Sequence, residues 1–418
     1  MTETGELKNS EADDLLISTI LTTEGRQDPY GAYAKLRNGK PRWLSSTGST
    51  VLAGYSDGLE ALRNPKLGRP EDDMGDQPTI SGRQRSLEGT TTSMLLLNPP
   101  DHTRIRSLVS RTFTPRRIES LRPTMQSLLD PILAEFGRNG GGDLIAGLAA
   151  EFPISVISLL LGVPTGETAR IRPLVRSITS LIDSASDDAA IEKAHTDLAE
   201  LIDFFVNLID EKRKSPDDAL LSALIEVEEN GDKLSTEELI ANAILLYSAG
   251  FETTSNLIGN GMWLLLRNPE QMSELRAHPD LMSSAIMEML RADSPVQLNV
   301  RAVLEPVELF GEVRPRGDSF LILQGSGNLD ESIYPDADKF DVRRFVSSDQ
   351  AQPLSFGWGA HHCLGAHLAR AEGEIVFSSL LNSFQNIELD TQTLGAAVPT
   401  YRPSFTLRGL ESLPLQLS

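Results

Sequence analysis

Apolar residues in the middle of the chain recur at steps of three and four, which is the spacing of one face of an α-helix. This pattern predicts helices over Pro115–Phe136, Thr168–Ile182, Ala189–Lys212 and Asp217–Glu228. A more uniformly apolar segment, Phe152–Pro164, is shorter than the roughly 20 residues that a membrane-spanning helix needs. We interpret it as a buried helix of the core. Helix is therefore expected to dominate the fold.

Strand-like runs of β-branched and aromatic residues are few, and they lie far apart in the sequence. They are Arg42–Leu52, Val300–Leu309, Ser319–Leu323 and Ser404–Leu407. Any sheet must be small and assembled from distant parts of the chain. The sequence thus predicts a mainly α fold with a small β region.

The longest predicted helix begins at a capping box, in which Ser235 accepts the amide of Glu238 and the glutamate side chain reaches back. It ends at Asn268, before a proline, so roughly 32 residues at ~1.5 Å each give a length of almost 50 Å. Its first half is apolar on nearly every face, as expected of a buried helix. Residues 250–256 then bring glycine, acid and hydroxyl groups into it, which predicts a weakened, functional segment.

Two segments lack periodicity. Residues 1–14 are acidic and polar, and we expect a flexible N-terminal arm followed by a single domain over residues 15–418. Residues 69–92 are rich in Gly, Asp, Ser and Thr, which predicts a long loop. Such a loop is either a gate over a substrate site or a surface insertion.

The charge of the chain argues against two classes of partner. With 38 Lys+Arg against 59 Asp+Glu, the net charge of −21 repels nucleic acid and anionic membranes. The N-terminus lacks the basic start and apolar stretch of a secretory signal, and no segment predicts membrane insertion. A single cysteine excludes an internal disulfide and is typical of a cytoplasmic protein.

That one cysteine lies in the run Phe356-Gly-Trp-Gly-Ala-His-His-Cys363-Leu-Gly-Ala-His-Leu-Ala-Arg370. Apolar residues then follow at helical steps, which places Cys363 at the start of an amphipathic helix. Helix N-terminal amides favour a thiolate, so a lowered pKa of the cysteine is expected. A zinc site is excluded because no second cysteine exists. The alternative reading is a small buried hydrophobic residue.

The spacing Phe-x-x-Gly-x-His-x-Cys-x-Gly around Cys363 resembles the haem-binding loop of the cytochrome P450 family. Glu288 and Arg291 resemble the Glu-x-x-Arg signature of the same family, for which Arg344 is the downstream arginine partner. The resemblance implies a single triangular, mainly helical domain with heme b, whose iron takes Cys363 as its axial ligand. The role that it implies for the Glu-x-x-Arg residues is structural.

A third match is Ala249-Gly250-Phe251-Glu252-Thr253-Thr254, which resembles the oxygen-activating segment of the family. Glu252 and Thr253 are the expected catalytic residues, the carboxyl group relaying protons from solvent and the hydroxyl group steadying the oxygen species. Gly250 is expected to leave space for oxygen. The alternative is a polar kink that is satisfied within the helix.

Haem carries two propionates, which need cationic or hydrogen-bonding partners when they are partly buried. The resemblance implies four such residues: His102, Arg106, Arg301 and His361. Of these, Arg301 has the weakest support, because a strand arginine more often faces solvent. Five arginines between His102 and Arg117 also predict a basic face, either for docking an acidic ferredoxin or for propionate binding alone.

The resemblance implies a monooxygenase that inserts one oxygen atom from O2 into a small organic substrate, free or carrier-bound, and typically a secondary metabolite. Electrons would come from NAD(P)H through a ferredoxin reductase and a ferredoxin. Two alternatives are an auxiliary protein that activates a glycosyltransferase without haem chemistry, and a peroxygenase. Candidate pocket segments are Ser81–Met94, Val296–Asn299 and the turn near Ser404, where Gln297 and Asn299 suggest a ligand with polar groups.

Overall fold

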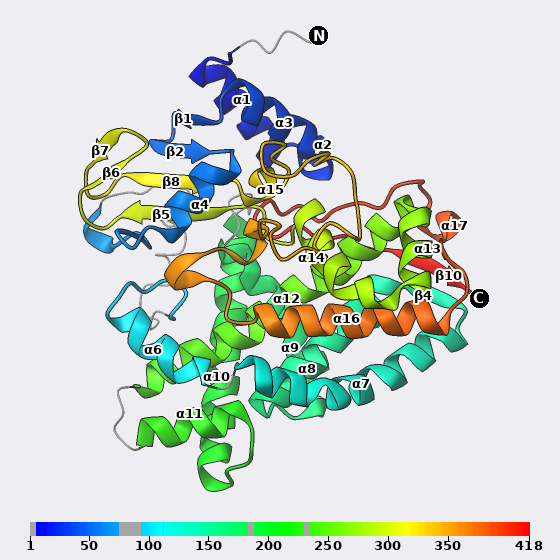
Figure 1. Ribbon diagram of the computed structural model, residues 1–418. Coiled ribbons are helices and arrows are strands. Elements are labelled where there is room, and N and C mark those ends of the chain that lie inside the picture. The colour runs from blue at the N-terminus through cyan, green and yellow to red at the C-terminus, as the bar shows by residue number, and fades with distance from the viewer. Residues whose placement is uncertain (1–5, 75–92, 112, 183–187, 230–233) are drawn as a thin grey trace.

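The computed structural model describes residues 6–74, 93–111, 113–182, 188–229 and 234–418. Most of the loop predicted at residues 69–92, and most of the candidate pocket segment 81–94, lie outside this range. Figure 1 shows a helical body with a small sheet at one corner. None of the described helices is long and apolar enough to cross a membrane.

The helical body contains every helix predicted from the hydrophobic pattern, with ends shifted by a few residues. Thr168–Ile182 is α-helical only to Ile178 and continues as a 3-10 turn. The helices of the body are α6 (Asp101–Ser110), α7 (Pro115–Arg138), α8 (Glu151–Leu161), α9 (Thr168–Ile178), α10 (Asp188–Lys214), α11 (Leu220–Glu229), α12 (Thr236–Arg267), α13 (Pro269–Ala277), α14 (Met282–Ala292) and α16 (Ala366–Ser383).

Helix α12 runs through the centre of this body (Figure 1). Its predicted capping box is present: the Glu238 amide donates to Ser235 Oγ at 3.2 Å, and the Ser235 amide donates to Glu238 Oε2 at 2.9 Å. The helix ends at Arg267 and is continuous through residues 249–256. The helix accommodates the polar segment without a break, because Thr253 bonds the helix backbone at Ala249 while Glu252 and Asn256 bind Arg402 beside the helix.

The main sheet joins five strands in the order β1-β2-β8-β5-β3. Only the β2–β8 pair is parallel. The predicted run 42–52 is a hairpin, and the run 300–309 divides into β5 and β6, the latter pairing with β7. The strands are β1 (Arg42–Leu44), β2 (Ser49–Leu52), β3 (Leu67–Gly68), β5 (Asn299–Val303), β6 (Val307–Leu309), β7 (Glu312–Arg314) and β8 (Ser319–Ile322).

The prediction of a strand at Ser404–Leu407 is wrong. This segment forms one isolated bridge, Val296 to Leu407, and Ser404 Oγ accepts the Leu407 amide at 3.2 Å in a turn. A serine hydroxyl that binds a nearby amide competes with strand pairing. The C-terminal strand is β10 (Pro414–Leu417), which lies between β4 (Gly141–Asp143) and β9 (Ile387–Leu389).

The expectation of a flexible arm over residues 1–14 is also wrong from residue 9 onward. Helix α1 (Asn9–Leu21) buries Ala12 and Leu16 on one face. Asp13 is buried as well, where it accepts the Trp43 indole N–H at 2.7 Å and the Ser46 amide at 2.6 Å. The four-residue step between the apolar residues supplies a packing face. The helices that accompany it are α2 (Thr23–Gln27), α3 (Tyr30–Gly39) and α4 (Tyr55–Arg63).

Candidate functional site

Cys363 lies in a tight loop that leads into α16, as predicted. Gly357 and Gly359 have φ angles of 62° and 72°, a conformation that residues with side chains rarely adopt. The loop closes on itself, because the Cys363 amide donates to the Phe356 carbonyl at 2.8 Å. The sulfur thus stands just before the first turn of α16, which begins at Ala366.

The expected lowering of the thiol pKa is not what the structure shows. Burial raises the pKa of Cys363, and the Gly365 amide and the charge of Arg106 only partly oppose this effect. Desolvation of a thiolate outweighs a single amide at the helix start. A bound metal cation is the partner that would keep such a sulfur deprotonated.

The sulfur of Cys363 is accessible. Cys363 is an exposed residue, although many protein atoms surround its sulfur. A Cβ placed on Gly365 would meet only the Cys363 sulfur, at 3.9 Å, and no other atom within 4 Å. The loop therefore leaves the approach to the sulfur open to a bound group.

The four predicted propionate partners come together around this loop. The His102 ring, on α6, lies 4.2 Å from the His361 ring, centroid to centroid. Arg106, one turn along α6, donates to the His362 carbonyl at 2.5 Å. Arg301, on β5, is only 2% exposed, so it is not the solvent-facing strand arginine that was the main alternative.

A fifth member of the cluster, Arg69, was not among the residues predicted from the sequence. It follows β3 directly, and its guanidinium donates to Asn299 Oδ1 at 3.3 Å. The same Asn299 oxygen accepts from Arg301. Arg69 and Arg301 are thus held side by side. The only signal in the sequence was one arginine at the start of a loop, which has no distinguishing pattern.

The cluster is strongly electropositive. Burial is the main cause that lowers the pKa of His102 to about 4 and of His361 to about 2, and nearby arginines lower both further. Burial also lowers the pKa of Arg69 to about 10. In the described part of the chain, no carboxylate pairs with the three arginines of this cluster, Arg69, Arg106 and Arg301.

Several nitrogens in the cluster have no partner among the described residues. They are His102 Nδ1, His361 Nε2 and Arg69 Nε. Buried cations and donors without partners are costly, so the cluster requires an anionic ligand with several acceptor oxygens. A pair of carboxylates carried by a group next to Cys363 meets this requirement, and the propionates of haem have this chemistry.

Glu252 and Thr253, which are neighbours on α12, occupy different environments. Thr253 is partly exposed and its hydroxyl donates to the Ala249 carbonyl at 2.9 Å. Glu252 is 3% exposed and forms an ion pair with Arg402, which also binds Asn256. Arg402 could not be predicted as a partner from the sequence, because it lies 150 positions away from Glu252.

Gly250 has a packing role, and its predicted role in leaving space for oxygen stays a prediction. A Cβ at this position would meet the Ile157 side chain at 3.1 Å. Ile157 belongs to α8, which packs closely against α12. The close approach of two helices therefore accounts for the glycine.

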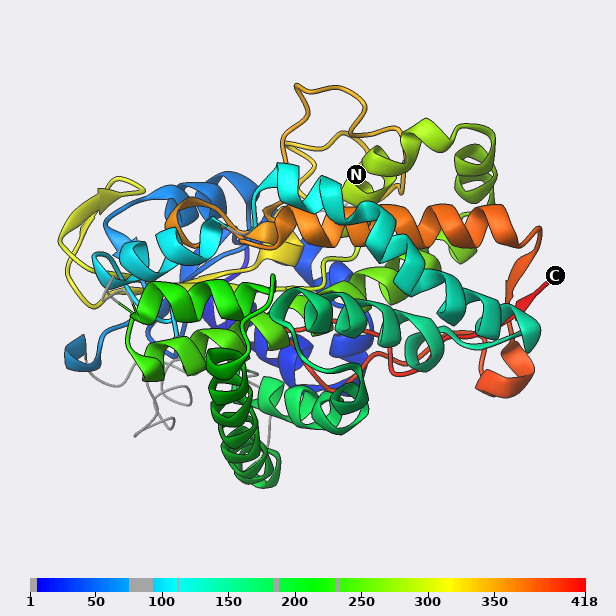
Figure 2. The ribbon, with the colours of Figure 1, turned by 90° about the horizontal axis from the view of Figure 1, so that it is seen from below.

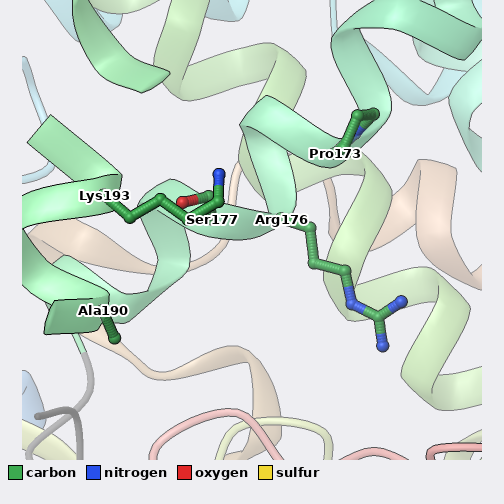
Figure 3. Close-up of a pocket in the computed structure, with 5 residues that line it drawn as sticks. All are labelled: Pro173, Arg176, Ser177, Ala190 and Lys193. Atoms are coloured by element: carbon green, nitrogen blue, oxygen red, sulfur yellow. The ribbon is translucent and has the colours of Figure 1, made fainter. Parts of the chain in front are cut away.

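A surface depression of about 340 Å³ lies between α9 and α10 (Figure 3). Arg176, which lines it, extends away from Ser177 and Lys193 in this view. Burial lowers the pKa of Arg176, followed by the charge of Arg402, whereas Glu252 raises it. The charges of Glu252 and Arg402 therefore act on Arg176, which lines the depression.

The Glu-x-x-Arg pair is fully buried and bound to the arginine predicted for it. Arg291 Nε lies 2.7 Å from Glu288 Oε2, and Arg344 Nε lies 3.1 Å from the same oxygen. Arg291 also donates to the carbonyls of Asn328 and Ala337. This triad fixes the segment that precedes the cysteine loop.

The polar side chains taken as hints of a polar ligand are already engaged. Gln297 is 1% exposed, accepts from the Tyr33 hydroxyl at 3.1 Å and donates to the Ser294 carbonyl at 2.7 Å. Asn299 accepts from two arginines of the cluster. Neither amide therefore supports a polar substrate.

Comparisons with known proteins agree with this geometry. The model of the family "Cytochrome P450" matches residues 67–401. The chain is 39% identical to the vitamin D(3) 25-hydroxylase of Pseudonocardia autotrophica over 406 residues, covering 94% of each chain. It is 38% identical to the cytochrome P450 monooxygenase PikC of Streptomyces venezuelae, covering 93% of this chain and 91% of PikC.

Solved structures show the same fold. The structure of P450BioI in complex with an acyl carrier protein ligated to hexadec-9Z-enoic acid superposes with a TM-score of 0.84 at 30% identity, covering 95% of this chain and 99% of the other. Relatives named as monooxygenases and hydroxylases and a matching fold agree with a cysteine loop flanked by an electropositive cluster. The chain therefore belongs to the cytochrome P450 family and is a haem-thiolate monooxygenase.

Proposed function

We propose that the protein inserts one oxygen atom from O2 into a small organic substrate, a secondary metabolite. The observation that carries this proposal is the buried cluster of arginines and histidines beside Cys363. Its arginines pair with no carboxylate in the described part of the chain. An auxiliary protein without haem would not need such a cluster. Cys363, Glu252 and Thr253 are all retained, which also argues against that alternative and against a peroxygenase.

In this proposal Cys363 would bind the iron of heme b. His102, Arg106, Arg301 and His361 would hold the propionates, and Arg69 would add a further cation to their site. When it is bound, haem supplies the activation of O2, favoured by an electron-rich thiolate. The chain supplies the rest: an enclosed site, fixed orientation and protons.

Proton delivery is assigned to Glu252 and Thr253. Glu252 is buried and paired with Arg402, so this ion pair must break before Glu252 accepts a proton from solvent. Arg176, beside the depression between α9 and α10, lies on the side from which that proton would come. The Thr253 hydroxyl is one residue further along α12 and would pass the proton on, as a positioned general acid.

Electrons are proposed to come from NAD(P)H through a ferredoxin reductase and a ferredoxin, in the cytoplasm. Fewer arginines are available for the basic face than the five that the sequence predicted. Arg104 pairs with Glu238 and Asp101, and Arg106 faces the cysteine loop. Arg117 is half-buried and donates to the Asp218 carbonyl, so Arg111 and Arg116 are the exposed cations of this stretch that can meet an acidic partner.

The substrate class rests on the relatives. PikC, a vitamin D(3) 25-hydroxylase and a 6-deoxyerythronolide B hydroxylase are among the proteins that the chain resembles. Vitamin D(3) and 6-deoxyerythronolide B are therefore the first compounds to test. Because P450BioI is seen with a loaded acyl carrier protein, each compound should be tested both free and bound to a carrier protein.

The test begins with the haem-loaded protein. Reduced protein under carbon monoxide should show the strongly red-shifted Soret band of a thiolate-bound haem, and Cys363→Ser should abolish that band. Compounds that shift the haem spin state are then supplied with ferredoxin, reductase, NAD(P)H and isotopically labelled O2. A product that carries one labelled oxygen atom supports the proposal, and a wild-type protein without the red-shifted band overturns it.

A further inference from the structure

One asparagine joins two members of the electropositive cluster that come from different parts of the fold. Asn98 stands just before α6, and its backbone carbonyl accepts the His102 amide at 2.9 Å. Its side chain binds the backbone of Arg69, which lies 29 positions earlier in the chain. The proposed function assigns no role to this residue.

The side-chain amide of Asn98 binds both polar groups of the Arg69 backbone. Asn98 Oδ1 accepts the Arg69 amide at 2.7 Å, and Asn98 Nδ2 donates to the Arg69 carbonyl at 2.8 Å. Such a pair of bonds fixes the position and the direction of a backbone, as a rung of a sheet does. Gly68 permits the close approach, because a Cβ there would lie 2.2 Å from Asn98 Oδ1. Asn98 therefore sets the orientation in which Arg69 leaves β3.

The bonds at the other end of Arg69 are longer. Its Nη1 donates to Asn299 Oδ1 at 3.3 Å and to the Val300 carbonyl at 3.4 Å, and both oxygens also accept from Arg301. Bonds of this length are weak, and the two guanidinium groups repel each other. The backbone bonds to Asn98 are thus the firmer anchor that keeps the Arg69 side chain in the cluster.

The same amide also engages a neighbouring acid. Glu71, two positions after Arg69, accepts from Asn98 Nδ2 at 3.2 Å, and its other oxygen pairs with Arg316 at 2.7 Å. Among the described residues Arg69 forms no ion pair with it, and Arg69 Nε is buried without a partner. The charge of Arg69 is therefore left for an anion that a ligand brings.

We propose that Asn98 is a positioning residue of this enzyme, which holds Arg69 in place for a haem propionate. The inference rests on the proposed function, in which the cluster binds the propionates. Because the Asn98 carbonyl also accepts the His102 amide, the residue connects the Arg69 side of the cluster to α6. It transfers no proton or electron. Its effect is to order the cation before the ligand arrives, which lowers the entropic cost of binding.

The decisive variant is Asn98→Ala, which removes the side-chain bonds and leaves the backbone bond to His102. Gln27→Ala is the matched control, because the Gln27 amide binds the Tyr401 backbone in the same two-way manner, at 3.0 and 3.1 Å. Each haem-loaded protein is mixed with an excess of apomyoglobin, and the transfer of haem is followed. Transfer should be about tenfold faster or more in Asn98→Ala, as expected for one lost hydrogen bond to a charged group. In Gln27→Ala it should match the wild type.

The second readout is the reduction potential of the haem iron. A cation beside the propionates favours the reduced iron, which carries one positive charge less. In Asn98→Ala the potential should therefore become more negative while the red-shifted carbon monoxide band persists, and Gln27→Ala should change neither. Asn98→Ser, which keeps one oxygen as an acceptor, should give smaller changes, and it replaces the alanine variant if that variant does not fold.

A double-mutant cycle with Arg69→Gln separates positioning from a purely structural role. Arg69→Gln keeps the backbone groups that Asn98 binds, so adding Asn98→Ala should still lower the free energy of unfolding of the haem-free protein. Haem transfer should then accelerate by no more than about twofold, because the charge that Asn98 positions is already gone.

Two results would overturn the inference. One is a wild-type rate of haem transfer in a folded Asn98→Ala protein. The other is an equal acceleration by Asn98→Ala with and without the Arg69 side chain, which would reduce Asn98 to a structural role. Failure of the proposed function is seen separately, as a wild-type protein without the red-shifted band.

Discussion

His102 and Thr253 illustrate how single side chains depend on what surrounds them. His102 stands among arginines, so its neutral form is favoured, whereas in the unfolded chain it titrates near its ordinary value of about 6.5. The Thr253 hydroxyl donates to the helix backbone, so it can donate to another group only if this hydrogen bond breaks. Each side chain therefore predicts a measurable response.

The histidine predicts a pH dependence for the haem-free protein. Because the folded pKa of about 4 lies below the unfolded value, the folded state binds fewer protons over this interval. The free energy of unfolding should therefore fall as the pH is lowered from about 6.5 toward 4. Denaturant titrations at several pH values should show a shallower decline in His102→Gln, and parallel curves for the two proteins would contradict this assignment.

Haem loading should weaken the same dependence. Propionates beside the cluster would favour the protonated histidine, which raises the folded pKa toward the unfolded one. The loaded protein should then lose less stability than the haem-free protein between pH 6.5 and 4. An equal loss with and without haem would place the propionates away from His102.

The threonine predicts a change in coupling. Thr253→Ala should load haem and show a normal substrate-induced spin shift, because the side chain is only partly buried and has no packing partner that depends on its hydroxyl. Product formed per NAD(P)H should fall by about tenfold or more while peroxide rises. Thr253→Ser keeps the hydroxyl and serves as the control. Unchanged product yield in the alanine variant would refute the assigned role.

Elements show which features the sequence predicts and which it does not. The capping box at Ser235, the cysteine loop and the Glu288–Arg291 pair were predictable because their residues are close neighbours in the chain, so spacing alone carries the signal. Arg402 was not predictable as a partner of Glu252, since 150 positions separate them. Tertiary packing decides such contacts, and a single sequence holds no pattern for them.

The same reasoning explains the errors at the two ends of the chain. Residues 9–14 have an acidic composition that favours solvent, yet the four-residue step from Ala12 to Leu16 is enough to dock α1. At the other end, Ser404–Leu407 has the composition of a strand, but the Ser404 hydroxyl accepts the Leu407 amide and only one bridge forms. Local hydrogen bonding and docking each outweighed composition.

The contact between the C-terminal segment and α12 predicts a sensitive glycine. A Cβ on Gly409 would collide with the side chains of Asn256 and Arg402, so Gly409→Ala should displace the partner of Glu252. We expect a loss of about 1–3 kcal/mol in the free energy of unfolding, as for other overpacked sites. Gly31→Ala is the control, since nothing lies within 4 Å of its Cβ. Equal stability of the two variants would show that the segment yields freely.

On the scale of the whole molecule, charge is unevenly distributed. The net charge is −21, yet exposed arginines lie at the end of α6 (Arg111) and at the start of α7 (Arg116). Arg116 is in the first turn of α7. Helix α7 lies along α16 (Figure 2), and Arg122 of α7 pairs with Glu374 of α16. An acidic electron donor would therefore be repelled by most of the surface and attracted near the cysteine loop.

Arg116→Glu should accordingly slow electron delivery without altering the site. Because steering by a local charged face raises association rates by about tenfold or more, the reversal should lower the rate of reduction by ferredoxin by roughly that factor at low salt. Added salt should slow the wild type much more than the variant, since it screens the attraction that the variant has lost. Stopped-flow reduction at several ionic strengths measures both effects. Arg170→Glu, which reverses an exposed arginine on α9, should behave as the wild type, and an equal slowing in both variants would show that net charge alone governs the encounter.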